Sequence, residues 1–160
     1  MISDTHNWLD EKVFKHFESC DEIWHAGDFG SIEIAERLAA CRPLKGVYGN
    51  IDGMDVRSIY REKLRWTCED VEVLMIHIGG YPNRYSPEAK KEIAQKPPQL
   101  FISGHSHILK IIYDDKYNLL HINPGAAGKQ GWHQMRTIVR FTIDGKEMKD
   151  CEVIELGKRA

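Results

Sequence analysis

Five short groups of polar residues in this sequence each follow an apolar run, and they contain side-chain types that bind divalent metal ions. The groups are Ser3-Asp4-Thr5-His6, Gly27-Asp28, Gly49-Asn50-Ile51-Asp52, His77 and Gly104-His105-Ser106-His107. We interpret each apolar run as a buried strand that ends where its polar group begins. Open α/β sheets gather their ligand residues at the carboxyl ends of the strands, so these side chains are expected to converge at one edge.

Seven residues in these groups offer carboxylate, amide or imidazole ligand atoms: Asp4, His6, Asp28, Asn50, His77, His105 and His107. On extended chain, residues at the spacing of Asp4 and His6 point the same way, and His105 and His107 repeat this spacing. Mixed oxygen and imidazole ligands suit manganese, iron, zinc, nickel or cobalt. Seven ligands exceed the needs of one ion, and sharing Asp28 between two ions explains the number. Two metals about 3.5–4 Å apart can clamp a phosphate and activate a bound water, which predicts hydrolysis of a phosphate ester.

Each member of this set also has a simpler explanation when it is taken alone. A single histidine at a strand end is more often a hydrogen-bonded core or surface residue than a metal ligand. Asp28 and Asn50 are good turn residues beside their glycines, and Asp4 could cap the following helix. Five groups that each follow an apolar strand favour the metal site over five separate explanations.

The elements that must position these groups change in kind along the chain. Predicted helices cover residues 9–20, a segment capped by Ser31 and closed by Pro43, residues 55–60, and a segment between Ser86-Pro87 and Pro97-Pro98. Predicted strands cover residues 21–26, 45–48, 65–68, 71–78, 100–102, 108–113, 119–122, 136–143 and 148–156, and residues 79–83 are predicted to form a loop. This order predicts an α/β fold of two packed mixed β-sheets flanked by helices.

The first strand is short, because only Met1-Ile2 precedes Ser3-Asp4, whereas strands commonly have about 5–6 residues. We expect this strand to lie in the middle of its sheet, since Asp4 and His6 must reach a site fed by strands on both sides. We also expect the natural protein to carry several more apolar residues before Met1, through a truncated first strand or a start codon assigned too late.

The composition is that of an ordinary globular chain, with 160 residues, 42% hydrophobic residues and a net charge of −2. The length predicts a single domain over residues 1–160. Scattered lysines and arginines argue against a stable nucleic-acid complex, and no apolar run reaches the ~20 residues that span a bilayer. The four cysteines lie far apart, and we predict buried thiols and a cytoplasmic location. A small phosphate ester is the expected partner, and a homo-oligomer is compatible with the sequence.

Taken together, the five polar groups resemble the five ordered blocks of the calcineurin-like metallophosphoesterases. The chain is most similar to their small single-domain branch of bacterial and archaeal phosphodiesterases, to which the retromer coat subunit is related. The similarity runs from Ile2 to about Gly128 and includes Ile122-Asn123-Pro124-Gly125. It implies a four-layer α-β-β-α sandwich and two divalent metal ions per chain, with Mn²⁺ preferred and Zn²⁺, Fe²⁺, Ni²⁺ or Co²⁺ as alternatives.

The resemblance also implies a role for each ligand. Asp4, His6, Asp28 and His107 would hold the first metal, and Asp28, Asn50, His77 and His105 would hold the second, with Asp28 bridging. The nucleophile would be a metal-activated water or hydroxide, and Asn50 would also contact the substrate. His25, beside Gly27-Asp28, could orient the bridging water and act with Asp28 and Asn50 in catalysis, although a backbone-bonded strand histidine explains it equally well.

Two positions differ from the family pattern. Many larger members carry a histidine directly after the Gly-Asn pair that protonates the leaving group, whereas this chain has Ile51. General acid catalysis contributes about 10²–10⁴-fold, so esters with poor leaving groups are expected to react slowly. An arginine expected after the Asn-Pro-Gly turn is replaced by Lys129-Gln130, so binding of the phosphate is assigned to Lys129, His133 or Arg136.

Two functions from different classes remain open at this point. The first is a metal-dependent phosphoesterase, with a diester favoured over a monoester as substrate. The second is a non-catalytic protein-binding scaffold of the retromer-subunit type. Because every ligand position holds a competent side chain, and clustered carboxylates are costly to bury unless cations neutralise them, we favour the enzyme.

Overall fold

The computed structural model describes residues 1–160 and contains four helices and eleven strands. The helices are α1 (Lys12–Phe17), α2 (Ile32–Cys41), α3 (Met54–Arg57) and α4 (Pro87–Gln95). The strands are β1 (Ile23–His25), β2 (Leu44–Gly46), β3 (Lys63–Cys68), β4 (Val71–Ile76), β5 (Gly80–Tyr81), β6 (Arg84–Tyr85), β7 (Leu100–Ile102), β8 (Lys110–Asp114), β9 (Leu119–Asn123), β10 (Met135–Asp144) and β11 (Glu147–Lys158). None of the helices has the length and apolar character needed to cross a lipid bilayer.

The larger sheet is mixed and has five strands in the order β3-β4-β7-β9-β8. The neighbours β4 and β7 are parallel, as are β7 and β9, whereas the two outer pairs are antiparallel. In β4, Val73 and Met75 pack into the core between the two β layers, while Leu74 and Ile76 pack toward α4. The strand is therefore buried on both faces, which explains its continuous apolar sequence.

The second β layer joins the parallel pair β1–β2 to the antiparallel pair β10–β11 through the first residues of the chain. Ile2 bridges His25 of β1, and its backbone exchanges hydrogen bonds with Trp24 and Ala26. On the other side, Met1 and Val139 of β10 bond to each other through both backbone groups. The first strand thus lies in the middle of its layer, as predicted.

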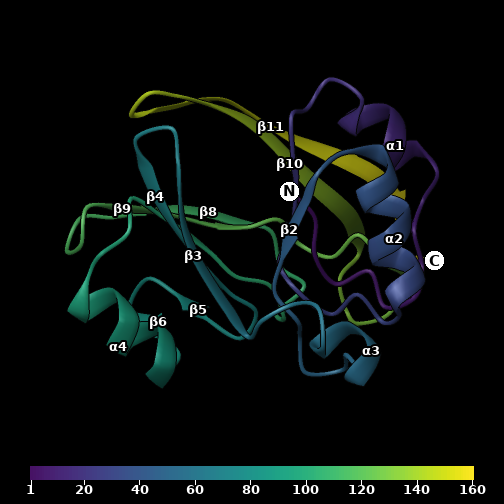
Figure 1. The fold of residues 1–160 in the computed structure, drawn as a ribbon, viewed down its shortest axis with the longest axis horizontal. Helices are drawn as coiled ribbons and strands as arrows, with labels where there is room; N and C mark the ends of the chain where they lie inside the picture. Colours follow the sequence, from purple (N-terminus) through teal and green to yellow (C-terminus); the bar gives the residue numbers. More distant parts are fainter.

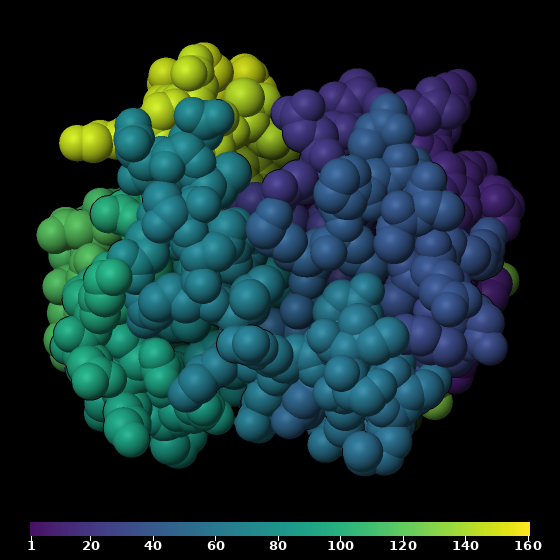
Figure 2. All heavy atoms as spheres, viewed as in Figure 1, coloured from purple at the N-terminus to yellow at the C-terminus, as the bar shows by residue number.

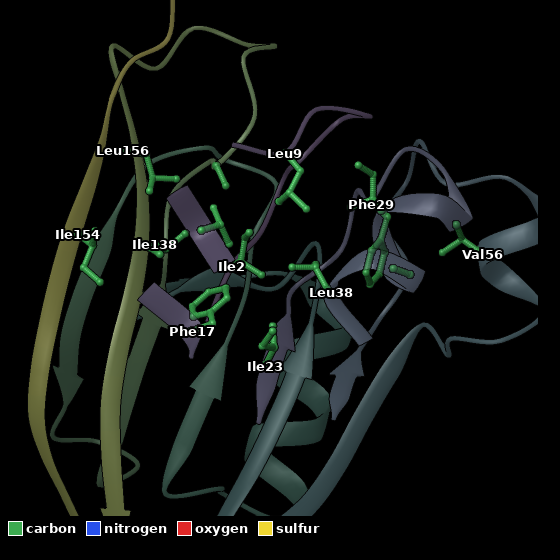
Figure 3. Close-up of a cluster of buried hydrophobic side chains, with 14 residues drawn as sticks. Ile2, Leu9, Phe17, Ile23, Phe29, Leu38, Val56, Ile138, Ile154 and Leu156 are labelled. Carbon is green, nitrogen blue, oxygen red and sulfur yellow. The ribbon is translucent and has the colours of Figure 1, made fainter. Parts of the chain in front are cut away.

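Helices cover the outer face of each layer. Side chains of α1 and α2, including Phe17 and Leu38, pack onto Ile2, Ile23 and Ile138 of the second β layer (Figure 3). Helix α4 lies on the other side of the molecule, against the five-stranded sheet (Figure 1). The resulting order of helix, β layer, β layer and helix confirms the predicted fold class.

The two long hairpins meet at their tips, far from the helices α3 and α4. The backbone N–H of Asp70, in the β3–β4 turn, donates to the carbonyl of Gly145, in the β10–β11 turn. Figure 2 shows these segments as the teal and yellow surfaces that adjoin at the top of the molecule. This contact ties the two β layers together at the edge opposite to the predicted site.

Three local predictions need correction. Helix α1 begins at Lys12 rather than Leu9, because Asp10 accepts a hydrogen bond from the Lys12 N–H and forms an ion pair with Arg136 instead of continuing a helix. The predicted loop 79–83 instead contributes to a small hairpin of β5 and β6. The cysteines form no disulfide, but they are not all buried: Cys151 is exposed and the other three are half-buried.

Candidate metal centre

The structure brings all seven predicted ligand residues to one edge of the molecule, where strands of both β layers end. Their ligand atoms form two compact groups. We call Asp4, His6 and His107 the first group, and Asp28, His77 and His105, with the adjacent Asn50, the second group. The convergence expected from the strand ends is therefore present in the fold.

In the first group, three ligand atoms face one another closely. His107 Nε2 lies 3.2 Å from Asp4 Oδ1 and 3.2 Å from His6 Nε2, and His6 Nε2 lies 3.9 Å from Asp4 Oδ1. Nitrogen ligands lie about 2.0–2.1 Å from a bound zinc, so neighbouring ligands of one ion are about 3 Å apart. The spacing in the first group matches that arrangement.

In the second group, His77 Nε2 lies 3.2 Å from Asp28 Oδ2 and 3.1 Å from Asn50 Oδ1. His105 Nδ1 lies 3.0 Å from the same Asn50 oxygen. Asp28 Oδ2 is also 3.5 Å from His6 Nε2 of the first group. Asp28 therefore lies between the groups, where a carboxylate can serve both.

The residues present fit a bound cation, because one carboxylate oxygen has no partner within the protein. Asp4 is fully buried, and its Oδ2 accepts hydrogen bonds from Ser3 Oγ (2.7 Å) and the His105 N–H (3.2 Å). Its Oδ1, which faces the histidines of both groups, has none. A buried charged oxygen without a partner is costly, and a divalent ion would supply that partner.

Five of the seven candidate ligands adopt a left-handed backbone conformation. Their φ angles are 52° at Asp4, 44° at His6, 58° at Asp28, 66° at His105 and 60° at His107. Such angles are uncommon outside glycine and cost about 1–3 kcal/mol each, so the surrounding structure must enforce them. The expectation that Asp4 and His6 share a face of extended chain was therefore wrong: tight turns aim these side chains.

Two glycines make room for the ligands. At Gly27 (φ +101°), a Cβ would come within 2.5 Å of His77 Nδ1. At Gly49, a Cβ would overlap Asp28 Oδ1. Both positions therefore require glycine because the ligand side chain occupies the space a larger residue would need.

A hydrogen bond to the backbone orients one of the buried candidate ligands, His77. His77 Nδ1 donates to the Ala26 carbonyl at 2.7 Å, which directs the Nε2 lone pair toward the site. Burial lowers the pKa of His77, but the hydrogen bond to Asp28 and the charges of Asp4 and Asp28 outweigh it and raise the pKa overall. Burial likewise raises the pKa of Asp28, and contacts with His77 lower it overall. The site is thus strongly attractive to positive charge.

The loop that carries Asn50 is held from both sides. Asp52 accepts hydrogen bonds from the N–H groups of Gly49 (2.7 Å) and Gly30 (2.8 Å). Arg57 of α3 donates to the carbonyls of Asp52 (2.6 Å), Asn50 (3.3 Å) and Gly49 (3.4 Å). Sequence reasoning missed Arg57, because one arginine on a short helix carries no spacing signal.

His25 lies behind the site rather than among the ligand atoms. It is fully buried, its Nδ1 accepts from the Gly27 N–H at 3.1 Å, and its Nε2 lies 3.1 Å from Thr5 Oγ1. Its ring stacks on Phe29 at 3.7 Å, and burial lowers its pKa well below the usual value. Both nitrogens are engaged within the protein, so His25 supports the turn before Asp28.

The residues predicted to bind the phosphate fall in three different environments. Arg136 is buried and paired with Asp10, so it is not available to a substrate. Lys129 is exposed, with its Nζ 4.6 Å from the centre of the Trp8 ring. The His133 ring lies 5.3 Å from that of His107, and its Nε2 donates to the Gly128 carbonyl. Of the three, only His133 contacts a candidate ligand.

A hollow of about 210 Å³ adjoins the second group and is lined by Tyr48, Asn50, Arg57, His77 and Ile78, among others. A larger hollow of about 550 Å³ lies elsewhere, beside Met1, Trp24 and the β3–β4 turn, and contains none of the candidate ligands. The smaller hollow is therefore the one that borders candidate ligand residues.

Comparison with known proteins identifies a family and agrees with the fold. The family model described as the calcineurin-like phosphoesterase superfamily domain matches residues 1–146, whereas no curated protein matches the chain. The fold is similar to that of an archaeal phosphodiesterase (TM-score 0.74, 22% identity, 97% of each chain covered). It is also similar to Vps29 of Entamoeba histolytica in complex with Zn²⁺ (0.72, 16%, 96% of each chain). A third similar structure is a predicted phosphoesterase of Streptococcus pneumoniae (0.68, 18%, 96% of this chain and 94% of the other).

Proposed function

Because the chain belongs to the calcineurin-like phosphoesterase superfamily, we propose that it hydrolyses phosphate esters with two divalent metal ions. In this proposal the first ion is bound by Asp4, His6, Asp28 and His107. The second is bound by Asp28, Asn50, His77 and His105. The observation that carries the proposal is the buried Asp4 Oδ1, which lacks a hydrogen-bond partner and faces imidazole nitrogens of both groups at 3.2–3.9 Å.

The metals would lower the pKa of a bound water into the nucleophilic range and neutralise charge on the phosphate. The protein contributes the geometry: Asp28 lies between the groups, and left-handed turns after the strands orient His6, His105 and His107. Because Asn50 Oδ1 faces His77 and His105, its amide N–H groups remain to donate to a phosphate oxygen. The water would release a proton to solvent, its oxygen would form a bond to phosphorus as the bond to the leaving oxygen breaks, and the leaving group would take a proton from solvent.

We propose Mn²⁺ as the native metal, with Zn²⁺, Fe²⁺, Ni²⁺ and Co²⁺ as alternatives, because the donor set mixes oxygen and imidazole ligands. The similar Vps29 of Entamoeba histolytica is described with Zn²⁺, which supports a metal of this class in the fold. Loading the metal-free chain with each ion in turn and comparing hydrolysis rates would identify the metal that supports the reaction best.

The proposed substrate is a diester with a good leaving group. Ile51 follows Asn50 directly, and its side chain has no proton to donate, so the leaving group departs without an acid at that position. Aryl diesters should therefore react far faster than alkyl monoesters, and the rate should depend steeply on the pKa of the leaving group. A flat dependence with chemistry rate-limiting would show that another acid acts, and His133 would be the first residue to replace.

The alternative is a protein-binding scaffold of the retromer-subunit type, since the fold is similar to Vps29 as well as to a phosphodiesterase. The two functions differ in what the purified chain should carry. The enzyme should retain nearly two ions per chain by elemental analysis and hydrolyse members of a panel of phosphomonoesters, phosphodiesters and cyclic nucleotides with manganese. A folded chain that binds no metal and hydrolyses none of them would contradict the enzyme and favour the scaffold.

A further inference from the structure

Strand β8 is an unpaired edge of the five-stranded sheet, and it is unusually apolar for that position. Its only neighbour in the sheet is β9. Exposed fractions are 38% at Ile111 and Ile112, 56% at Tyr113 and 61% at the preceding Ile108. Natural edge strands are commonly protected by charged side chains or by short length, because a free edge is a template for pairing with another chain.

The opposite edge of the same sheet is protected in this way. Strand β3 carries Lys63 and Arg65, which form ion pairs with Glu72, Glu88 and Glu92. Strand β8 has charges only at its two ends, Lys110 and Asp114. The contrast identifies β8, rather than β3, as the edge suited to accept another strand.

The backbone of β8 shows which groups are free to pair. In β9, the Leu120 N–H donates to the Gln99 carbonyl and the Ile122 carbonyl accepts from Ser103, so these two residues face β7. Backbone direction alternates along a strand, so the residues between and beside them face β8. Their partners in β8 are Lys110, Ile112 and Asp114. The backbone groups of Ile111 and Tyr113 therefore point outward from the sheet.

From this arrangement we propose that two copies of the chain pair antiparallel through β8, about a two-fold axis at Ile112. In this register Ile111 lies opposite Tyr113 of the second copy, so the outward backbone groups of both residues meet as hydrogen-bonded pairs. Lys110 lies opposite Asp114 of the second copy, and Ile112 lies opposite its own equivalent. The five-stranded sheets of the two copies thereby form one continuous sheet of ten strands.

Charge complementarity selects this register and favours a second copy as the occupant. If the second copy is shifted by two residues in one direction, Lys110 faces Lys116 of that copy, and Ile112 faces its Asp114. If it is shifted by two residues in the other direction, Lys110 faces Ile112 of the second copy and has no opposite charge. Opposite charges on directly facing residues stabilise an antiparallel pair, and like charges destabilise it. The strand is thus complementary to itself in one register.

The charged side chains are already on the same face and fixed in position. The Lys110 Nζ lies 3.5 Å from the centre of the Tyr81 ring, and Asp114 accepts a hydrogen bond from the Tyr85 hydroxyl at 2.6 Å. Both tyrosines belong to the β5–β6 hairpin, which packs on that face. Alternation puts Ile111 and Tyr113 on the other face, beside their β9 partners Ile122 and Leu120 at the rim of the core between the layers.

The first test replaces the residue on the proposed axis. Ile112→Lys places two lysines opposite each other and should raise the dimer dissociation constant by at least about 100-fold, since it also removes two isoleucines that pairing would bury further. Ile59→Lys is the matched control, because Ile59 is 63% exposed and lies outside β8. Sedimentation velocity over micromolar to millimolar chain concentrations measures the constant, and circular dichroism confirms that both variants fold.

The second test uses the charges and depends on the register. Lys110→Asp and Asp114→Lys each place two like-charge pairs in the homodimer and should weaken it by about tenfold. Mixing the two variants makes both pairs attractive again, so heterodimers should form preferentially, as measured by native mass spectrometry with one chain isotope-labelled. A wild-type chain that is monomeric at millimolar concentration, a dimer that survives Ile112→Lys, or a mixture without preferred heterodimers would each overturn the proposal.

Discussion

The two ligand groups at the strand ends differ in how far the protein already satisfies them. In the first group, Asp4 is buried and its Oδ1 has no partner. In the second group, the Asn50 oxygen lies within hydrogen-bond distance of both His77 and His105, and Asn50 and His105 are exposed. The difference indicates that the first group should hold its ion tightly, while the second should exchange its ion and meet the substrate.

The largest effect is expected from a substitution that acts on both groups at once. Asp28→Asn should lose both ions, because Asp28 Oδ2 faces His6 of one group and His77 of the other. Hydrolysis should fall by more than about 100-fold, beyond the 10–100-fold typical of an outer hydrogen-bond partner. Elemental analysis measures the ions, with Asp115→Asn in an exposed turn as the control. Retention of one full ion would show that Asp28 belongs to one group only.

The next prediction separates the groups. His105→Ala should leave about one ion per chain after dialysis, because the first group is intact, whereas His6→Ala should weaken the tightly held ion more than the other. Titration of each metal-free variant with Mn²⁺ in a calorimeter distinguishes the two sites. Equal loss of both ions in the two variants would contradict the division into groups.

A smaller effect is expected from Arg57, which holds the loop of the second group. Arg57→Ala removes donors to three backbone carbonyls and should weaken only the second ion, by about tenfold. Arg57→Lys should restore little, because an ammonium cannot span these carbonyls as the planar guanidinium does. Arg61→Ala, at an exposed arginine nearby, is the control. Weakening of the first ion by the same factor would mean that Arg57 stabilises the whole fold.

The smallest expected effect is on the pH dependence of stability, and it comes from His121, a buried histidine outside both groups. Burial lowers the pKa of His121 to about 4, below the value near 6.5 in an unfolded chain. The unfolded chain therefore binds a proton first as pH falls through 6.5, so this part of the stability is present above pH 6.5 and is lost toward pH 4.

Between pH 7 and 5.5 this loss amounts to about 1 kcal/mol of the unfolding free energy. His121→Gln should remove that part of the pH dependence and leave metal content at pH 7.5 unchanged. Urea unfolding of both chains with a chelator present measures the difference. If the variant keeps the full pH dependence, the acid sensitivity arises in another group, and His25, whose pKa burial also lowers, would be the next residue to replace.

The parts of the fold that could be predicted from the sequence are those fixed by local pattern. The β3–β4 hairpin follows from two strand-like runs around Glu69-Asp70, and α4 begins where Ser86 caps it and Pro87 opens it. The convergence of the ligands was also predictable, because each polar group follows an apolar strand.

What could not be predicted depends on contacts between distant segments. The left-handed turns at Asp4 and His6 are held by hydrogen bonds from their N–H groups to the carbonyls of Gly27 and Asp28. The inward orientation of His25 depends in the same way on Thr5 and Phe29. No local pattern distinguishes a histidine that faces a site from one that supports it from behind.

The position of the first strand has a consequence for the synthesis of the protein. The Met1 amino group donates a hydrogen bond to the carbonyl of Val139, 138 positions later in the chain. The carbonyl of Asp4 accepts a hydrogen bond from the Gly128 N–H. A ribosome adding about 5–20 residues per second needs on the order of 10 s to reach those partners after Asp4 has been made. During that interval the backbone groups of Met1 and Asp4 that bond to Val139 and Gly128 have no partner on the nascent chain. The second β layer is therefore completed only when the chain is nearly finished, because its central strand has no partner on that side until β10 has been made.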